Sequence, residues 1–177
     1  RMTSDMANAL VREGFELIIP FDADECWHAS IGGIARQLRR REANALSVPV
    51  VNYIQSRAVR QAEPGCWRTA TRRVPRAINP QVHIADAVGT QRISFVEKAF
   101  ARKVLAAPPR GSTVHFVKGN HNVRFDGAKV AQIRMLPCLH LPLRAASELE
   151  KRVVDYRDRH APFRIDGAGW RLDYWAE

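Results

Sequence analysis

The sequence lacks any apolar stretch of the roughly 18 to 20 residues that a membrane span needs, and its start lacks a charged segment followed by an apolar signal core. Its three cysteines, Cys26, Cys66 and Cys138, are odd in number, widely spaced and outside any CxxC pattern. This spacing excludes a disulfide framework and a zinc knuckle. We therefore expect a cytoplasmic protein in a reducing compartment, with three buried and inert thiols.

Lysine and acidic residues are also scarce relative to arginine. Only five of the 28 basic residues are lysine, and there are 18 acidic residues, so arginine carries most of the net charge of +10. Arginines gather at 36–41 and at 57–76. This excess predicts anionic partners, which include diphosphates, anionic lipid headgroups and nucleic acid. For either group alone, a solvated arginine-rich surface is an equally good interpretation.

The length of 177 residues, with 46% hydrophobic residues, suits a single domain over 1–177 with a sizeable core. Helix and strand patterns along the chain predict an α/β class. The expected helices are 3–13, 30–42 with Ile31, Ile34 and Leu38 on one side, and 145–159. The expected strands are 15–21, 46–54 with Pro49 marking an edge strand or a bulge, 114–117, and 131–143 broken by Pro137 and Pro142.

Other segments are less regular. The pair Asp126-Gly127 is a hairpin turn signal, and 94–105 is compatible with either a strand pair or a short helix. Residues 55–91 are basic, aperiodic and rich in proline and glycine, which predicts a long loop region. Loops of this length are usually functional, so we expect an acceptor-binding segment or a lid there.

The most informative segment is Leu17 to Trp27, where three carboxylates follow an apolar run. Because 15–21 has the composition of a core strand, Asp22, Asp24 and Glu25 are expected where the sheet ends and ligands bind. Oxygen ligands of this kind suit Mg²⁺ or Mn²⁺ better than zinc. The alternative is that the acids form a turn or cap the next helix. Three adjacent acids repel one another, however, and exceed what a cap needs.

Two segments that come later in the sequence are informative because of their order after the acidic segment. They are Lys118-Gly119-Asn120-His121 and His140-Leu141-Pro142-Leu143-Arg144. With Asp22-Ala23-Asp24-Glu25, they resemble the branch of glycosyltransferase family 2, a group of GT-A enzymes, that carries DADE, GNH and HxPxR segments. The serine that follows the arginine in that branch is displaced here, to Ser147.

The resemblance implies a GT-A-like mixed sheet flanked by helices, and transfer of a sugar from a UDP- or GDP-sugar donor to a glycan or lipid acceptor. It implies that Mn²⁺ or Mg²⁺ is held by Asp22, Asp24 and His140. The expected donor-binding residues are Arg144, Lys151 and Asn120. The expected catalytic residues are Glu25, His121 and Asp86, with Glu97 and His83 as further candidates for the base.

Each of these roles has an ordinary structural alternative. His140 is equally typical of a core or hinge histidine, and Arg144 of a surface arginine at a helix start. Asn and His are also common in a turn before a hairpin, which is the alternative for Asn120 and His121.

One departure from the family pattern has consequences for activity. GT-A domains begin with βαβ units that bind the nucleoside and precede the D-x-D strand, whereas one helix precedes it here. The resemblance therefore implies that these first units lie outside this sequence. We expect a fragment of a longer protein, a partner subunit that completes the fold, or a noncatalytic remnant.

Two functions of other classes are compatible with the sequence. One is a noncatalytic basic module that binds nucleic acid or lies peripherally on an anionic membrane, with a steep salt dependence. Nucleic acid is the less favoured of these partners, because helix-turn-helix, zinc and RNP-like patterns are missing. The other is a Mg²⁺-dependent phosphoryl-transfer enzyme in which Asp22 is the nucleophile.

Overall fold

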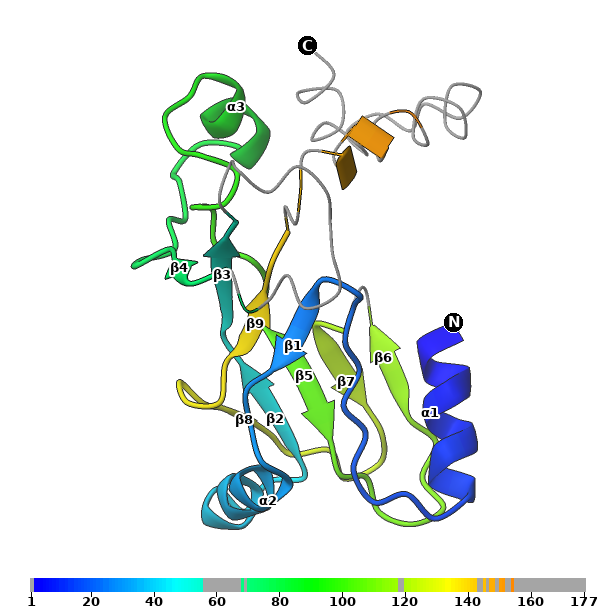
Figure 1. Cartoon of the computed structure of the whole chain (residues 1–177). Coiled ribbons are helices and arrows are strands. Elements are labelled where there is room, and N and C mark those ends of the chain that lie inside the picture. The colour runs from blue at the N-terminus through cyan, green and yellow to red at the C-terminus, as the bar shows by residue number, and fades with distance from the viewer. Residues whose placement is uncertain are drawn as a thin grey trace. The chain divides into compact units, whose positions relative to one another are not determined.

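Figure 1 shows the computed structural model of the chain, which describes residues 2–55, 68, 70–117, 120–142, 145, 147–148, 150–151 and 154. The chain divides into two compact units, whereas the sequence predicted one domain. Unit 1 comprises Arg1–Val51 and Phe100–His140, and unit 2 comprises Asn52–Ala99 and Leu141–Glu177. Helices combine with parallel and antiparallel strands, in agreement with the α/β class. Within the described ranges, no helix is long and apolar enough to cross a membrane.

Unit 1 contains most of the regular structure. Its elements are α1 (Met2–Arg12), β1 (Glu25–Trp27), α2 (Ile31–Arg40), β2 (Ala45–Val48), β5 (Lys103–Ala106), β6 (His115–Val117), β7 (Asn122–Arg124), β8 (Val130–Gln132) and β9 (Cys138–His140). From unit 1, β3 (Val50–Ile54) leads into unit 2, which contains β4 (Arg72–Arg73) and α3 (Ile84–Gly89).

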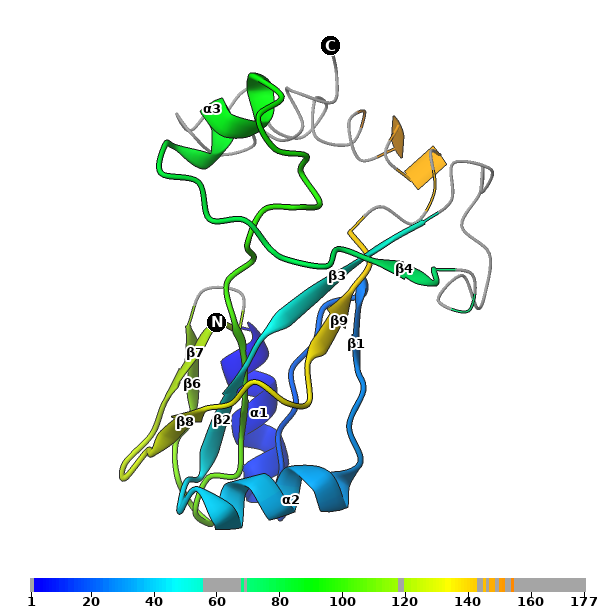
Figure 2. The same ribbon diagram turned by 90° about the vertical axis from the view of Figure 1, so that its left-hand side faces the viewer.

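A three-stranded mixed sheet in the order β5-β2-β8 lies at the centre of unit 1 (Figures 1 and 2). Strands β2 and β5 are antiparallel, with Leu46 opposite Leu105, whereas β2 and β8 are parallel. A second set of strands has the order β1-β9-β3-β4. Strands β6 and β7 form a separate antiparallel hairpin.

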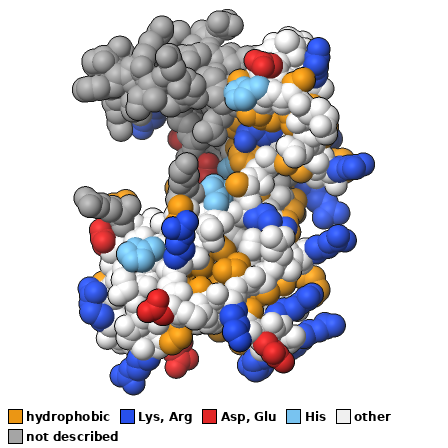
Figure 3. Space-filling model, turned by 180° about the vertical axis from the view of Figure 1, so that it is seen from behind, with side chains coloured by type: hydrophobic (Ala, Val, Ile, Leu, Met, Phe, Trp, Pro, Cys, Tyr) orange, Lys and Arg blue, Asp and Glu red, His pale blue; other side chains and the backbone are white. Residues whose placement is uncertain are grey.

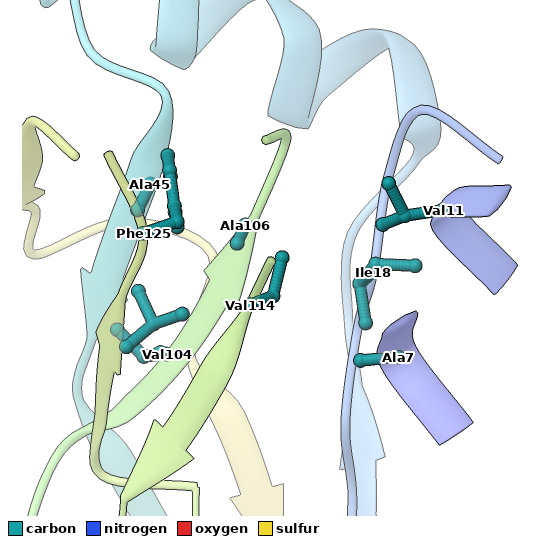
Figure 4. Close-up of a cluster of buried hydrophobic side chains, with 9 residues drawn as sticks. Ala7, Val11, Ile18, Ala45, Val104, Ala106, Val114 and Phe125 are labelled. Carbon is teal, nitrogen blue, oxygen red and sulfur yellow. The ribbon is translucent and has the colours of Figure 1, made fainter. Parts of the chain in front are cut away.

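The central sheet is covered on both faces, because successive side chains of a strand point to opposite sides. On one side, Ala45, Val104 and Ala106 pack with α1 and the β6-β7 hairpin (Figure 4). We call this the hairpin face. On the other side, Leu46 and Leu105 pack with residues of α2 and β9, and we call this the α2 face.

Helix α1 forms as the sequence predicts and ends at Arg12, and the chain then turns at Gly14, whose φ of +94° favours glycine. It buries Ala7 and Val11 against the hairpin face. Its polar side chains pair with the backbone before and within β6: the Asn8 amide donates to the Val114 carbonyl at 3.0 Å and accepts from the Val114 N–H at 2.7 Å. These contacts fix α1 against this edge of the hairpin.

Helix α2 also matches its predicted position. The Ser30 hydroxyl caps it by accepting from the Gly33 N–H at 3.0 Å, which satisfies a backbone donor of the first turn. Ile34 is buried as expected and Leu38 is partly buried. Ile31 was expected on the same side but is 73% exposed, because it lies in the first turn beyond the edge of the core.

The predicted strand over 15–21 is wrong. The only ladder contact of this segment in the described structure is an isolated antiparallel bridge between Ile18 and Ala106. Phe15 and Phe21 are exposed. Pro20 removes a backbone donor that a continuing strand would need. The first strand, β1, instead begins at Glu25, so the acids lie before and at the start of a strand.

Other strand predictions hold with changes of detail. Residues 46–54 form β2 and β3, which separate at Pro49 and join different sheets. Residues 114–117 contain β6, and 131–143 contains most of β8 and all of β9. The undecided segment 94–105 ends in β5.

The Asp126-Gly127 turn is present but does not form a hairpin. It connects β7 to β8, and β8 pairs with β2. The observed hairpin is β6-β7, which turns through Asn120, a residue with a φ of +64°. Within 55–91 the structure describes β4 and the short α3, while 56–67 and most of the predicted 145–159 helix lie outside the described residues.

Candidate metal centre

The acidic segment is a compact turn that leads into β1. The Glu25 N–H donates to the Asp22 carbonyl at 3.0 Å, and the Asp22 N–H donates to Glu25 Oε2 at 3.1 Å. The backbone and the side chain of Glu25 thus both bond to the backbone of Asp22 and stabilise the turn. Glu25 therefore has a role in forming the turn, which is the alternative interpretation that the sequence offered for these acids.

Pairing between β1 and β9 brings His140 to the acidic turn. Their antiparallel register places Glu25 opposite His140 and Trp27 opposite Cys138. His140 Nε2 lies 3.7 Å from Asp24 Oδ2, and both His140 and Glu25 are buried. The Phe100 ring packs edge-on against the imidazole, with centroids 4.6 Å apart. The side chain of His140 is therefore enclosed between the acidic turn and an aromatic ring.

The donor atoms of Asp24, Glu25 and His140 converge. One ligand atom from each residue lies within 4.8 Å of the other two. Two carboxylates and one imidazole form a mixed oxygen and nitrogen set, which suits Mn²⁺ and accepts other divalent metals. The structure thus groups Glu25, expected to be catalytic, with Asp24 and His140.

The first acid of the segment, Asp22, has a different partner from the one expected. Asp22 Oδ2 lies 2.7 Å from Lys103 Nζ, and Glu25 Oε1 lies 2.8 Å from the same nitrogen. The Lys103 side chain is only 5% exposed, whereas that of Asp22 is 53% exposed. Lys103, on β5, therefore connects the acidic turn to the central sheet, and Asp22 pairs with its ammonium group and not with the converging donor set.

The ionisation of the buried groups follows from this pairing. Burial alone would lower the pKa of Lys103, but hydrogen bonds and charge attraction from Asp22 and Glu25 outweigh burial and raise it. Burial raises the pKa of the Cys138 thiol, and the charge of Glu25 adds to this increase. Cys138 thus stays a neutral thiol at neutral pH and is no thiolate ligand.

Among the described ion pairs around Lys103, acidic side chains outnumber basic ones. Three carboxylates, those of Asp22, Asp24 and Glu25, lie around one ammonium group and one imidazole. The donor chemistry of the two carboxylates and the imidazole fits a divalent cation.

The Asn120-His121 segment lies beside β5, the strand that begins at Lys103, and is hydrogen-bonded to the residues on either side of Lys103. The Val104 N–H donates to the Asn120 carbonyl at 2.9 Å, and His121 Nδ1 donates to the Arg102 carbonyl at 2.9 Å. These bonds flank Lys103 in the chain. The side chain of Asn120 is buried, whereas His121 is exposed on the hairpin face.

The remaining expected site residues are not brought to this group within unit 1. Asp86 is exposed on α3 of unit 2, and the exposed Lys151 also belongs to unit 2. Arg144 lies outside the described residues, as do Lys118 and Gly119. Of the other base candidates, Glu97 accepts from the Ser94 N–H at 2.8 Å, and His83 precedes α3 as its exposed N-cap residue.

Sequence reasoning missed Lys103 as a member of the site. A signal was present, because Lys103 is one of only five lysines and begins the apolar run Val104-Leu105-Ala106. A lysine in a buried strand needs an acidic partner. The expectation of buried thiols also needs correction for Cys26, which is exposed, whereas Cys138 is buried as expected. Cys66 lies outside the described residues.

Compared with protein-family models, curated proteins and solved structures, the chain matches none of them. A function for this protein must therefore be argued from the geometry of its own residues.

Proposed function

We propose that unit 1 contains the metal-binding part of a GT-A-type glycosyltransferase of family 2, which transfers a sugar from a nucleotide-sugar donor to a glycan or lipid acceptor. The observation that carries the proposal is the convergence of the acidic turn and His140. These segments are distant in the sequence, and their pairing is the one that the resemblance requires of a metal site.

In this proposal, Asp24, Glu25 and His140 hold Mn²⁺ or Mg²⁺. The bound cation would stabilise the negative charge that develops on the leaving diphosphate. Lys103 fixes the orientation of Glu25 through the 2.8 Å contact, as an outer partner of a metal ligand does. Phe100 restricts the imidazole of His140 in the same way.

The surroundings of Glu25 favour a ligand role over a role as general base. Oε1 contacts Lys103 and Oε2 accepts from the Asp22 N–H, so both oxygens are engaged. A base must instead reach the acceptor hydroxyl within hydrogen-bond distance. Asp86 stays a candidate for that role, whereas His121 lies on the opposite face of the central sheet.

The proposal is tested by calorimetric titration of the chain with Mn²⁺, followed by UDP and GDP with and without the metal. We expect Mn²⁺ to bind to the wild type and to strengthen nucleotide binding. Asp24→Asn should weaken the Mn²⁺ affinity at least about tenfold, since loss of an outer partner of a ligand alone costs 10- to 100-fold. Asp5→Asn, which removes the same charge from an exposed position on α1, is the matched control.

The two steps of the experiment separate the two parts of the proposal. Unchanged Mn²⁺ affinity in Asp24→Asn would contradict the metal centre itself. Metal binding without any effect on UDP or GDP would contradict the assignment of a nucleotide-sugar donor and leave the metal centre in place.

A second candidate function is Mg²⁺-dependent phosphoryl transfer through Asp22. One observation favours it: the carboxylate of Asp22 is half exposed and is held by Lys103 at 2.7 Å. This function predicts a phosphorylated aspartate after incubation with Mg²⁺ and acetyl phosphate. Intact-mass measurement of the wild type and Asp22→Asn distinguishes it from sugar transfer, which gives no such adduct.

A further inference from the structure

A second polar site lies on the hairpin face of the central sheet, opposite to the side chain of Lys103. A cleft of about 420 Å³ opens there and lies wholly in unit 1. Its volume falls in the range of small-ligand pockets, roughly 300 to 1,000 Å³. None of its described lining residues is acidic. Its polar lining residues are Ser47, Arg102, His121, Asn122 and Gln132.

The guanidinium of Arg102 is held in place by neutral groups. Nε donates to the Ser47 hydroxyl at 3.1 Å, and Nη2 donates to the Ser47 carbonyl at 2.6 Å and to the Ile133 carbonyl. None of these bonds uses Nη1. Within the described part of the chain, no carboxylate forms an ion pair with Arg102.

This arrangement leaves a fixed positive charge without a counter-ion. Burial lowers the pKa of the Arg102 guanidinium, because the charged form loses water contacts. An arginine nevertheless remains protonated at neutral pH. A partly desolvated cation gains most from an anion that replaces the lost water.

His121 adds a second group of defined orientation. Its Nδ1 lies 2.9 Å from the Arg102 carbonyl, and a carbonyl can only accept, so Nδ1 carries the hydrogen. The other ring nitrogen, Nε2, therefore accepts a hydrogen bond from a ligand. The amide groups of Asn122 and Gln132 and the hydroxyl of Ser47 supply donors around the same space.

We propose that this cleft is a binding site for a small phosphate-bearing anion. Phosphate matches the site better than a carboxylate does, because its oxygens can accept from a guanidinium and side-chain amides while its remaining hydroxyl donates to the imidazole nitrogen. The cleft is larger than inorganic phosphate needs, so the ligand class is a small phosphate monoester. The site is separate from the metal centre and does not depend on the function proposed for it.

The test is calorimetric titration of the metal-free chain with inorganic phosphate in the presence of EDTA. We expect saturable binding to the wild type, and at least about tenfold weaker binding in His121→Ala and in Gln132→Ala. Both residues are exposed, so these variants should keep the fold. Asp24→Asn should bind phosphate as the wild type does, which makes the result independent of the metal centre.

Arg102 is tested by Arg102→Lys, which keeps the charge but loses the fork of donors. We expect binding to weaken several-fold. Arg102→Met also removes the donors of two backbone carbonyls, so the exposed His121 and Gln132 variants carry the test if that variant fails to fold.

Controls distinguish specific binding of phosphate in the cleft from nonspecific attraction of phosphate to a basic surface. Lys and Arg side chains are spread over the surface in Figure 3, with few acidic ones among them. Arg36→Gln removes an exposed arginine from α2, which packs on the opposite face of the sheet. It should leave phosphate binding unchanged. Absence of saturable binding in the wild type, or equal weakening in Arg36→Gln and His121→Ala, would overturn the proposal. Acetate that binds as tightly as phosphate would overturn the assignment to phosphate.

Discussion

Two consecutive basic residues at the start of β5 lie on opposite faces of the central sheet and have contrasting partners. Lys103, on the α2 face, contacts two carboxylates. Arg102, on the hairpin face, donates to a hydroxyl and to carbonyl groups, with no carboxylate partner in the described ranges. The comparison shows that one strand can place a lysine among carboxylates on one side and an arginine among neutral acceptors on the other.

The largest effect in this comparison is expected from Lys103→Met. The substitution leaves the buried Glu25 carboxylate without its ammonium partner, and breaking a buried ion pair in this way costs about 3 to 5 kcal/mol. Urea unfolding followed by circular dichroism measures the loss. Lys129→Met, at an exposed position, is the control and should change stability by less than about 0.5 kcal/mol. A loss below about 1 kcal/mol in Lys103→Met would show that the pair does not hold the turn.

A smaller loss is expected from Arg102→Met. Its partners are neutral, so the cost is that of carbonyl groups left without a donor, about 1 to 3 kcal/mol. The same unfolding experiment measures it. A loss equal to or greater than that of Lys103→Met would remove the energetic difference between the two faces.

The pH dependence of stability should report on Lys103 in the metal-free protein. Its pKa is raised in the folded state, so its contribution is complete below the ordinary lysine pKa of about 10.4 and is lost as the pH rises through the native value. Wild-type stability should therefore fall more between pH 10 and 12 than that of Lys103→Met, by thermal unfolding in EDTA. Parallel curves for the two proteins would contradict the pairing.

The last prediction concerns the difference in chemical reactivity between two thiols on the paired strands β1 and β9. Cys26 is exposed on β1, whereas Cys138 is buried on β9 with its pKa raised by burial and by Glu25. Iodoacetamide labelling of the native protein, followed by peptide mass spectrometry, should modify Cys26 and leave Cys138 unmodified until urea is added. Rapid native labelling of Cys138 would show that β9 does not protect this end of the site.

The sequence predicted those parts of the fold that local signals determine. Helix α1 ends shortly before Gly14, and α2 follows the Ser30 cap, both as the local pattern indicates. The acidic segment was identified as a candidate site, and His140 as a possible third ligand. Each of these predictions depended on residues close together in the chain or on the resemblance.

The parts that failed depend on contacts between distant segments. Residues 15–21 have strand composition, yet only Ile18 forms a bridge, because Pro20 and the turn at Asp22 end the pairing. Lys103 joins the acidic turn across a long stretch of sequence, and no local pattern identifies which acid it contacts. The same holds for Arg102, whose partners Ser47 and Ile133 lie on either side of it in the chain.

The most direct test of the metal centre is the Mn²⁺ affinity of His140→Gln, measured by the electron paramagnetic resonance signal of free Mn²⁺. His115→Gln, which changes an exposed histidine of β6 in the same unit, is the matched control. We predict that Mn²⁺ binds to the wild type and to His115→Gln with equal affinity, and to His140→Gln at least about tenfold more weakly. Equal affinity for all three proteins, or no binding to the wild type, would contradict the account.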